Sequence, residues 1–212
     1  MENPVIIFGA GYLGRAAKEI FEANGNVVYG FLDDNKKLHQ TEIDNAVVLG
    51  STDDDGFLKL IGKKCEAFIA IDEVKLRRNL VKTIQEVRKM QPTNGVHKSA
   101  IIAQTATMGH GNFIDLGVKV GSGATLGNHG MLHTGCIVGH DVKLGDFVQI
   151  GAGSVINPGV EIEDDAFIGS GVTIVSGITI GKGARVGAGS VVITPVKAGE
   201  TVFGNPAQKV NS

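Results

Sequence analysis

Apolar residues recur every six positions along the second half of the chain. From Val96 to Val192 every sixth residue is aliphatic, counting Met108, and the register never changes. A small or β-branched residue usually stands two positions earlier, and glycine often follows. A period of six fits neither an amphipathic helix nor an alternating strand, and it predicts a hexapeptide β-helix. The positions are Val96, Ile102, Met108, Ile114, Val120, Leu126, Leu132, Val138, Leu144, Ile150, Ile156, Ile162, Ile168, Ile174, Ile180, Val186 and Val192.

This repeat determines how the predicted β-helix is built. Each unit of six residues supplies one short strand and one turn, and three units make one triangular coil. Residues eighteen positions apart therefore stack in columns, with backbone hydrogen bonds running from coil to coil. Each coil of such a solenoid buries its interior only against its neighbours, so both ends need caps.

One edge of the predicted prism carries very small residues over three successive coils. Glycine is common at the corners of any β-helix, but other corners of this chain carry larger residues such as Phe147 and Lys182. Where side chains are absent, an extended ligand can approach backbone N–H and C=O groups. We therefore expect a binding groove along this edge. Its residues are Gly151-Ala152-Gly153, Gly169-Ser170-Gly171 and Gly187-Ala188-Gly189.

The first part of the chain alternates short apolar runs with helical patterns. Residues 4–8 form an apolar run that ends at the glycine-rich turn 9–14. A helical pattern follows at 15–24, and a second strand is expected at 26–32. This order of elements begins a doubly wound α/β sheet. Further strands are expected at 47–49 and 67–71, and further helices at 53–61 and 74–89.

The segment Gln91-Pro92-Thr93-Asn94-Gly95 separates the two patterns, because proline, asparagine and glycine favour turns. We therefore predict two domains. A Rossmann-like α/β domain covers residues 1–92. A β-helical domain covers residues 93–212.

The glycine-rich turn is the first candidate for ligand chemistry. Gly9, Gly11 and Gly14 form a G-x-G-x-x-G pattern, and the acidic pair Asp33–Asp34 follows the second strand. In this context backbone N–H groups at a helix N-terminus can hold phosphate, and Asp33 can meet a ribose hydroxyl. The same pattern also serves as a strand-to-helix turn without a ligand. The domain has no room for the second half of a dinucleotide fold, so we expect a mononucleotide or a nucleotide-sugar rather than NAD.

Composition excludes several classes of partner. The net charge of −2, the absence of Trp and the presence of only two Tyr argue against nucleic acid, and the charge argues against an anionic membrane surface. Cys65 and Cys136 fall in different predicted domains and are interpreted as reduced core residues. No apolar stretch is long enough to span a bilayer, and the N-terminus has no basic leader. We therefore expect a cytoplasmic protein.

Four histidines lie in the first part of the repeat. A zinc site needs several ligands that converge, whereas His133 and His140 fall on different faces, so we expect no metal. The pair His140–Asp141 lies at a corner and projects outward. A carboxylate beside a histidine can set the tautomer of a general base, although such a pair is also common as a solvated corner. The other two histidines are His110 and His129.

The segment Ile137-Val138-Gly139-His140-Asp141-Val142-Lys143-Leu144-Gly145-Asp146-Phe147 resembles the left-handed β-helix acyltransferases. The whole chain resembles one branch of them, the bacterial sugar acetyltransferases of the sialic-acid O-acetyltransferase and UDP-4-amino-sugar N-acetyltransferase type. This resemblance implies a left-handed β-helix and a homotrimer that binds acetyl-CoA between adjacent prisms. It also extends through Ile7-Phe8-Gly9-Ala10-Gly11, Gly30-Phe31-Leu32-Asp33-Asp34-Asn35, Phe68-Ile69-Ala70-Ile71 with Arg77 or Arg78, and Gly204-Asn205-Pro206-Ala207.

The resemblance also implies roles for individual residues. His140 would take a proton from the acceptor as the acceptor attacks the thioester, and Asp141 would hold His140. The pantetheine of acetyl-CoA would lie along Ala152, Ser170 and Ala188. Basic partners for the CoA phosphates would be Lys182, Arg185 and Lys209. The residues expected to bind the nucleotide-sugar in the first domain are Gly9, Gly11, Tyr12, Gly14, Asp33, Asp34, Ile71 and Asp72.

Three departures from the family pattern affect the expected site. Family members commonly carry Asn at the position of His133 and often His at that of Gln149, and both positions border the acceptor. Asp72 replaces a glycine and adds negative charge where the sugar or phosphate would approach. Pro158, one coil beyond the expected base, has no N–H, so an oxyanion would need another donor such as Gly159. One such donor is typically worth about 3 kcal/mol.

The leading interpretation is therefore acetyl-CoA-dependent acetylation of an amino group on a nucleotide-linked sugar, with His140 as general base. The same chemistry on a sugar hydroxyl is an alternative. A non-catalytic module that binds a nucleotide-sugar is another, and Asp72 and Pro158 would fit it. A zinc-dependent hydratase or lyase would require bound metal.

Overall fold

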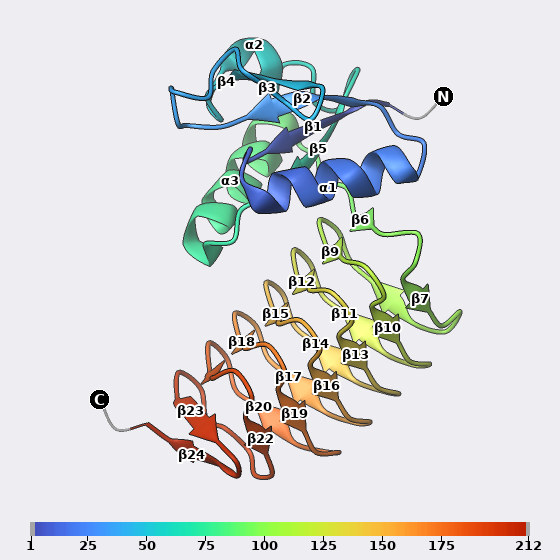
Figure 1. Ribbon diagram of the computed structural model, residues 1–212, viewed down its shortest axis with the longest axis vertical. Coiled ribbons are helices and arrows are strands. Elements are labelled where there is room, and N and C mark those ends of the chain that lie inside the picture. Colours follow the sequence, from blue (N-terminus) through green and yellow to red (C-terminus); the bar gives the residue numbers. More distant parts are fainter. Residues whose placement is uncertain (1–2, 211–212) are drawn as a thin grey trace. The chain divides into compact units, whose positions relative to one another are not determined.

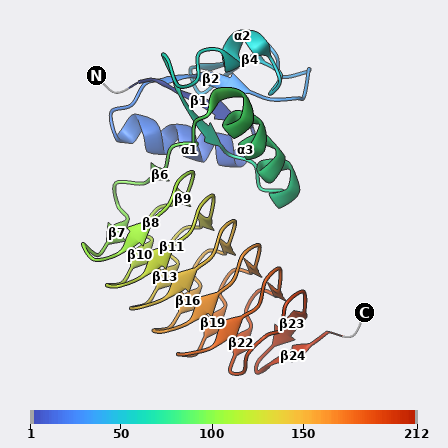
Figure 2. The ribbon, with the colours of Figure 1, turned by 180° about the vertical axis from the view of Figure 1, so that it is seen from behind.

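The structure is a computed structural model in which residues 3–210 are described. The chain divides into two compact units, residues 1–98 and 99–212 (Figure 1). The first unit is an α/β domain. The second is a parallel β-helix whose regular coils are also visible from behind (Figure 2). The fold class predicted from the sequence is confirmed.

The first unit is built on a sheet with the strand order β3-β4-β2-β1-β5. The central strand β1 pairs in parallel with both β2 and β5, whereas the edge strand β3 is antiparallel to β4. The elements are β1 (Val5–Phe8), α1 (Tyr12–Ala23), β2 (Val28–Leu32), β3 (Glu42–Ile43), β4 (Ala46–Gly50), α2 (Asp55–Leu58), β5 (Glu66–Ile69), α3 (Val74–Arg88) and β6 (Gly95–Val96).

Packing explains why these segments form. All residues of β1 are buried, as expected for a central parallel strand. Helix α1 buries one face, on which Phe21 makes an edge-to-face contact with Phe68 at 5.3 Å between ring centroids. Helix α3 begins at Glu73, whose carboxylate accepts the backbone N–H groups of Lys75 and Leu76. Helix α2 is shorter than the predicted 53–61, because the chain tightens into i→i−3 hydrogen bonds at Leu60 and beyond.

The second unit has strands of two residues on each of three faces. Lys119 pairs with Ile137 eighteen residues later, so successive coils stack in the predicted register. The first face holds β7 (Ile101–Ile102), β10 (Lys119–Val120), β13 (Ile137–Val138), β16 (Val155–Ile156), β19 (Thr173–Ile174) and β22 (Val191–Val192). The second face holds β8 (Thr107–Met108), β11 (Thr125–Leu126), β14 (Lys143–Leu144), β17 (Glu161–Ile162) and β20 (Thr179–Ile180).

The third face ends in an antiparallel hairpin. Strand β23 continues the parallel ladder from β21, and β24 folds back on it, so this hairpin closes the C-terminal end of the prism. Within the second unit, the strands of this face are β9 (Phe113–Ile114), β12 (Met131–Leu132), β15 (Gln149–Ile150), β18 (Phe167–Ile168), β21 (Arg185–Val186), β23 (Thr201–Gly204) and β24 (Ala207–Lys209).

The interior of the prism is filled by the residues of the six-residue repeat. Ile150, Ile156, Ile168 and Ile174 are completely buried, and so is Cys136. Burial raises the pKa of the Cys136 thiol to about 12, so this side chain behaves as a small apolar group. Both cysteines are free. None of the helices in the described part of the chain has the length and apolar character that a bilayer crossing requires.

Candidate active site

The coils turn at three corners, which are named here by their residues. The histidine corner includes the turns 121–124, 139–142, 157–160 and 175–178. The strip corner includes the turns 133–136, 151–154, 169–172 and 187–190. The capped corner includes the turns 109–112, 127–130, 145–148, 163–166 and 181–184.

His140 lies exposed at the histidine corner, directly after β13. Its Nδ1 atom lies 2.8 Å from the hydroxyl of Ser122 and accepts the backbone N–H of the same residue at 3.1 Å. Ser122 stands eighteen residues earlier, in the same column of the preceding coil. The imidazole is therefore held by its neighbour in the stack, and the sequence analysis did not single out that neighbour.

Asp141 does not hold His140. Its backbone is left-handed, with φ of 55°, and its N–H donates to the carbonyl of Ser122 at 3.0 Å. The carboxylate lies against Gly123 of the preceding coil, where an added Cβ would collide with Oδ1. The expected hydrogen bond between Asp141 and His140 is not formed within residues 3–210, because the left-handed conformation directs the carboxylate over Gly123. The stacking column was the signal that could have identified Ser122.

The backbone around Pro158 corrects a second expectation. The N–H of Gly159 donates to the carbonyl of His140 at 2.9 Å, as part of the ladder between coils. It is therefore engaged and not available to an oxyanion. Pro158 supplies no N–H either, as the sequence indicated.

The strip corner presents small side chains together with open backbone donors. Ala152, Ser170 and Ala188 are exposed, and their N–H groups donate to no acceptor within the described chain. At one end of this strip the ring of Phe203 lies against Gly187 and is 58 % exposed. The strip and His140 lie at different corners of the prism, with the first face between them. One chain alone therefore does not bring them together.

His133 and Gln149 lie on the side of the prism that carries the strip. The side-chain amide of Gln149 is 3.2 Å from Nε2 of His133, and the His133 ring is 6.0 Å from the ring of Phe113. Gln149 is nearly buried, at 7 % exposure. These two predicted acceptor-binding residues thus contact one another, but within one chain His133 lies at the strip corner and Gln149 in β15, whereas His140 lies at the histidine corner.

In the first unit the glycine turn has two tightly packed positions and one open position. Gly9 has φ of +99°, and an added Cβ would lie 2.7 Å from the carbonyl oxygen of Ala70. A Cβ on Gly14 would collide with the carbonyl of Gly9. Gly11 is the N-cap of α1 and has open space around it, and no side chain caps the helix there. The first N–H groups of α1 can therefore meet an anion.

The acidic pair after β2 is engaged with the chain itself. Asp33 accepts the N–H groups of Ala10 and Asn35, both at 2.8 Å, and so fixes the glycine turn. Asp34 accepts the N–H and the hydroxyl of Thr52, both at 2.9 Å. These contacts give both carboxylates a structural role, and the proposed contact with a ribose remains a prediction.

Tyr12 and Asp72 connect the start of α1 with the loop after β5. The phenol donates to the Asp72 carboxylate at 2.6 Å, and this hydrogen bond raises the pKa of Tyr12 to about 12. The buried guanidinium of Arg77 donates to the carbonyls of Ile71 and Asp72, at 2.6 and 3.0 Å. The negatively charged carboxylate of Asp72 is therefore hydrogen-bonded by the neutral phenol of Tyr12.

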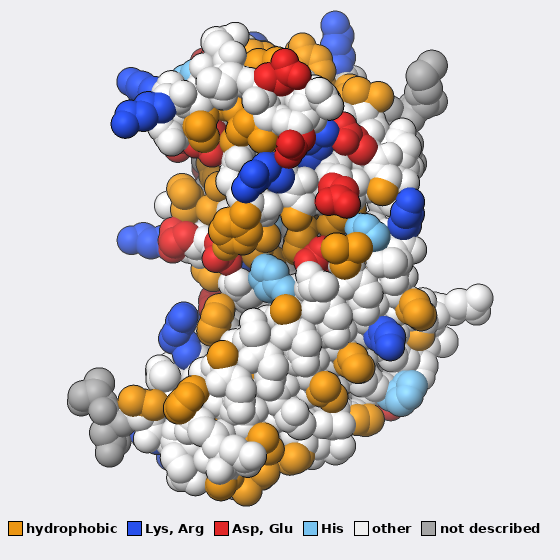
Figure 3. All heavy atoms as spheres, in the orientation of Figure 1, with side chains coloured by type: hydrophobic (Ala, Val, Ile, Leu, Met, Phe, Trp, Pro, Cys, Tyr) orange, Lys and Arg blue, Asp and Glu red, His pale blue; other side chains and the backbone are white. Residues whose placement is uncertain are grey.

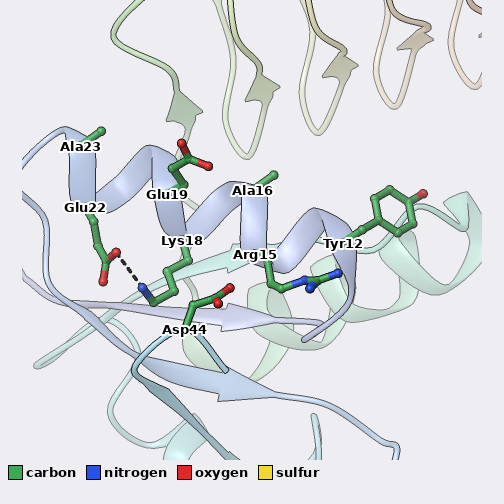
Figure 4. Close-up of a pocket in the computed structure, with 8 residues that line it drawn as sticks. All are labelled: Tyr12, Arg15, Ala16, Lys18, Glu19, Glu22, Ala23 and Asp44. Carbon is green, nitrogen blue, oxygen red and sulfur yellow. Dashed lines mark hydrogen bonds and ion pairs between the residues drawn. The ribbon is translucent and has the colours of Figure 1, made fainter. Parts of the chain in front are cut away.

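A pocket of about 630 Å³ lies along α1 (Figure 4). Of the residues expected to bind substrate, only Tyr12 lines it. Lys18 and Glu22 form an ion pair at 2.6 Å within it. The remaining lining residues are Arg15, Ala16, Glu19, Ala23 and Asp44.

Two segments of the chain match known family models. Residues 4–84 match the PglD N-terminal domain, and residues 159–194 match the bacterial transferase hexapeptide (six repeats). No curated protein sequence matches the chain.

Solved structures match over the whole length. PerB from Caulobacter crescentus, in complex with CoA and GDP-perosamine, has a TM-score of 0.90 at 26 % identity, and the match covers 100 % of this chain and 99 % of that one. The acetyltransferase domain of PglB from Neisseria gonorrhoeae FA1090, with acetyl coenzyme A, has 0.88 at 23 % identity, covering 99 % and 100 %. WeeI from Acinetobacter baumannii AYE has 0.81 at 26 % identity, covering 98 % and 99 %. The chain resembles sugar acetyltransferases of the left-handed β-helix class.

This similarity confirms the resemblance inferred from the sequence. The basic residues expected to bind the CoA phosphates form contacts within the chain. Lys209 pairs with Glu200 at 3.1 Å, and this contact lowers the pKa of the Glu200 carboxyl. Arg185 stacks on Phe167, with its guanidinium carbon 4.5 Å from the ring centroid. Lys182 lies 3.6 Å from the carboxylate of Asp164. Each of these three cations therefore already has a partner within the chain.

A zinc site, the metal-dependent alternative, would require several ligands that converge on one point. Within residues 3–210, no three His, Cys, Asp or Glu side chains gather into a set that could hold a metal ion.

Proposed function

We propose that the protein transfers the acetyl group of acetyl-CoA to the amino group of a nucleotide-linked amino sugar. The observation that carries this proposal is the full-length similarity to a structure that holds both CoA and GDP-perosamine, at 26 % identity and a TM-score of 0.90. The chain's own features support it: an exposed, oriented histidine at one corner and a strip of open backbone donors at another.

The reaction needs one base and one site for the thioester. The lone pair of the sugar amine attacks the carbonyl carbon of acetyl-CoA, so a C–N bond forms and the C–S bond breaks. His140 accepts the proton that the amine loses, and that proton can then pass to the departing thiolate. General base catalysis of this kind typically contributes about 10²- to 10⁴-fold in rate. Asp141 is proposed to act only by its negative charge beside the imidazolium.

The strip corner is proposed to bind the pantetheine arm. An extended pantetheine carries two amides, whose carbonyl oxygens can accept the N–H groups of Ala152, Ser170 and Ala188. The small side chains allow the arm to approach the backbone. Lys209 lies near the C-terminal end of the prism, in β24, and is proposed to exchange Glu200 for a CoA phosphate.

A homotrimer is proposed because the histidine corner and the strip corner lie apart within one chain. The outward residues of the first face include Ile101 and Ile137, 65 % and 37 % exposed, together with Val155 and Val191. Large exposed aliphatic side chains on one sheet face are typical of an interface. The second face is polar instead. Over the surface of the β-helix that Figure 3 shows, charged side chains are sparse. Its outward residues are Thr107, Thr125, Lys143, Glu161 and Thr179.

In such a trimer the histidine corner of one copy would meet the strip corner of the next. His140 from one chain and Ala152 and Ser170 from its neighbour would then line one groove. His133 and Gln149 would join the groove from the strip side and border the acceptor. The site would be incomplete in an isolated chain.

The first unit is proposed to bind the nucleotide. The uncapped N-terminus of α1 at Gly11 can hold a phosphate, and Gly9 and Gly14 shape the turn that presents it. Tyr12, Ile71 and Asp72 would contact the part of the substrate that lies beside the turn.

The test is acetyl-CoA turnover, followed through release of free thiol, with UDP-, GDP- and dTDP-linked 4-amino sugars and with free sialic acid. Turnover on an amino sugar, but not on the matching 4-hydroxy sugar, is the expected result. Turnover on sialic acid alone would replace the proposal by O-acetyl transfer. No turnover, combined with nucleotide-sugar binding by calorimetry, would leave a non-catalytic binding module. Sedimentation equilibrium tests the trimer.

A further inference from the structure

The contact between His140 and Ser122 has a chemical consequence for the proposed base. We propose that Ser122 is a positioning residue that selects the tautomer of His140 able to accept a proton. This inference rests on the proposed function and names a residue that acts through His140. It requires no contact between Ser122 and the substrate.

Two groups of Ser122 face the same ring nitrogen, and they have opposite requirements. The backbone N–H, 3.1 Å from Nδ1, is only a donor, so it favours a ring that carries its proton on Nε2. A ring in that form has no free lone pair at Nε2. The hydroxyl, 2.8 Å from Nδ1, can either donate or accept, so it can also accept from a protonated Nδ1.

The hydroxyl therefore makes the productive tautomer possible. When Nδ1–H donates to Ser122 Oγ, Nε2 has a lone pair and can take a proton from the acceptor. After that transfer the imidazolium carries a proton on each nitrogen, and Nδ1–H still has an acceptor. Asp141 cannot supply this acceptor in the observed conformation, because its carboxylate lies over Gly123. Ser122 thus takes the part that a carboxylate plays in other histidine bases.

The hydroxyl has no other role in the fold that would explain a loss of activity. Ser122 is exposed, and within residues 3–210 its Oγ contacts only His140. The coil ladder uses the backbone carbonyl of Ser122, which accepts the N–H of Asp141, and a side-chain substitution leaves that carbonyl in place. Ser176 occupies the same column three coils after Ser122 and is also exposed, so it offers a matched control.

The kinetic test compares Ser122→Ala, Ser122→Thr and Ser176→Ala with the wild-type protein. Ser122→Ala leaves only the donor facing Nδ1, so kcat should fall between about 10- and 100-fold while the KM for acetyl-CoA changes less than twofold. Ser122→Thr keeps a hydroxyl and should restore most of kcat. Ser176→Ala should match the wild type. A kcat for Ser122→Ala within twofold of the wild type would overturn the proposal.

A spectroscopic test is independent of activity. The ¹⁵N chemical shifts of the imidazole nitrogens report which nitrogen carries the proton, and the His140→Ala variant identifies the His140 signals. We expect a population of the Nδ1–H tautomer in the wild type and in Ser122→Thr, and its loss in Ser122→Ala. Equal tautomer populations in all three proteins would refute the inference. If the wild type turns over no acceptor, the proposed function fails, whereas this measurement still decides the role of Ser122.

Discussion

The strip corner and the capped corner are built from the same repeat but differ in the hydrogen-bond partners of their backbone N–H groups. Both stand on the third face of the prism, one after its strands and the other before them. At the capped corner, side chains of the chain itself accept four of the five outward N–H groups, those of His110, Asn128, Asp146 and Lys182. At the strip corner the corresponding N–H groups are open.

The contacts at the capped corner are specific. The N–H of Asn128 donates to the carboxylate of Asp146 at 2.7 Å, and the N–H of Asp146 donates to Asp164 at 2.9 Å. The N–H groups of His110 and Lys182 likewise donate to side chains one coil away, at 2.9 and 2.7 Å. The stacked carboxylates and amides therefore accept these backbone N–H groups, which have no partner in the ladder between coils.

The third residue of each turn shows a second difference. This position has positive φ at both corners, and at the capped corner it is occupied by His129, Phe147 and Asp165 as well as by Gly111 and Gly183. The fold therefore tolerates side chains in this conformation. At the strip corner the same position is always glycine, at 135, 153, 171 and 189. Backbone geometry alone does not demand this, and this contrast supports the pantetheine site proposed along the strip corner.

The largest expected effect comes from removing the proposed base. His140→Asn should lower kcat for acetyl transfer by about 10²- to 10⁴-fold, because it removes the group that accepts the proton of the amine. His110→Asn, at the capped corner, removes a second exposed histidine from the same prism and should leave kcat unchanged. Free-thiol release at saturating acetyl-CoA measures both. Equal losses in the two variants would mean that the corners do not differ in function.

Filling the strip should weaken the binding of acetyl-CoA rather than slow the chemical step. Ser170→Trp places a bulky side chain in the middle of the strip, so the KM for acetyl-CoA should rise about tenfold or more, a cost near 1.4 kcal/mol in binding. His110→Trp puts the same side chain at the equivalent position of the capped corner and should not change this KM. Calorimetry with CoA gives the affinity directly. Unchanged CoA affinity in Ser170→Trp would refute the strip as the pantetheine site.

The sequence was sufficient to predict the prism, because inward positions are fixed by packing. An apolar residue at every sixth position has to face the interior, so the strands, the columns and the strip around Ser170 followed from counting. The position of His140 at a corner followed in the same way. The α/β unit was predicted in outline from the glycine turn and the apolar runs on either side of it.

Contacts at the corners were harder to predict, because they depend on the sign of one dihedral angle and on the neighbouring coil. Asp141 adopts φ of 55°, and its carboxylate therefore lies over Gly123 instead of beside His140, the residue before it in the sequence. The N–H of Gly159 is consumed by the ladder. Ser122 lies eighteen residues from His140, and column counting would have paired them. Sequence adjacency suggested Asp141 instead.

A smaller effect is expected where the capped corner contributes stability. Asp164→Ala removes the acceptor of the Asp146 N–H and the partner of Lys182, so the free energy of unfolding should fall by about 1 kcal/mol. Acetyl-CoA turnover by the folded protein should be unaffected. Ser170→Ala, at the strip corner, should change stability by less than about 0.5 kcal/mol. Urea unfolding at one fixed protein concentration measures both, since assembly makes stability depend on concentration.

The smallest effect concerns the glycines of the strip. Gly171 has φ of +67° and nothing within 4 Å of an added Cβ, and asparagine tolerates this conformation well. Gly171→Asn should therefore cost less than about 1 kcal/mol of stability, which urea unfolding can measure. Its side chain would project into the strip, so the Kd for CoA should rise severalfold. The reverse result, a large loss of stability with unchanged CoA affinity, would mean that the strip corner carries glycine for its backbone alone. The contrast with the capped corner would then no longer indicate a binding surface.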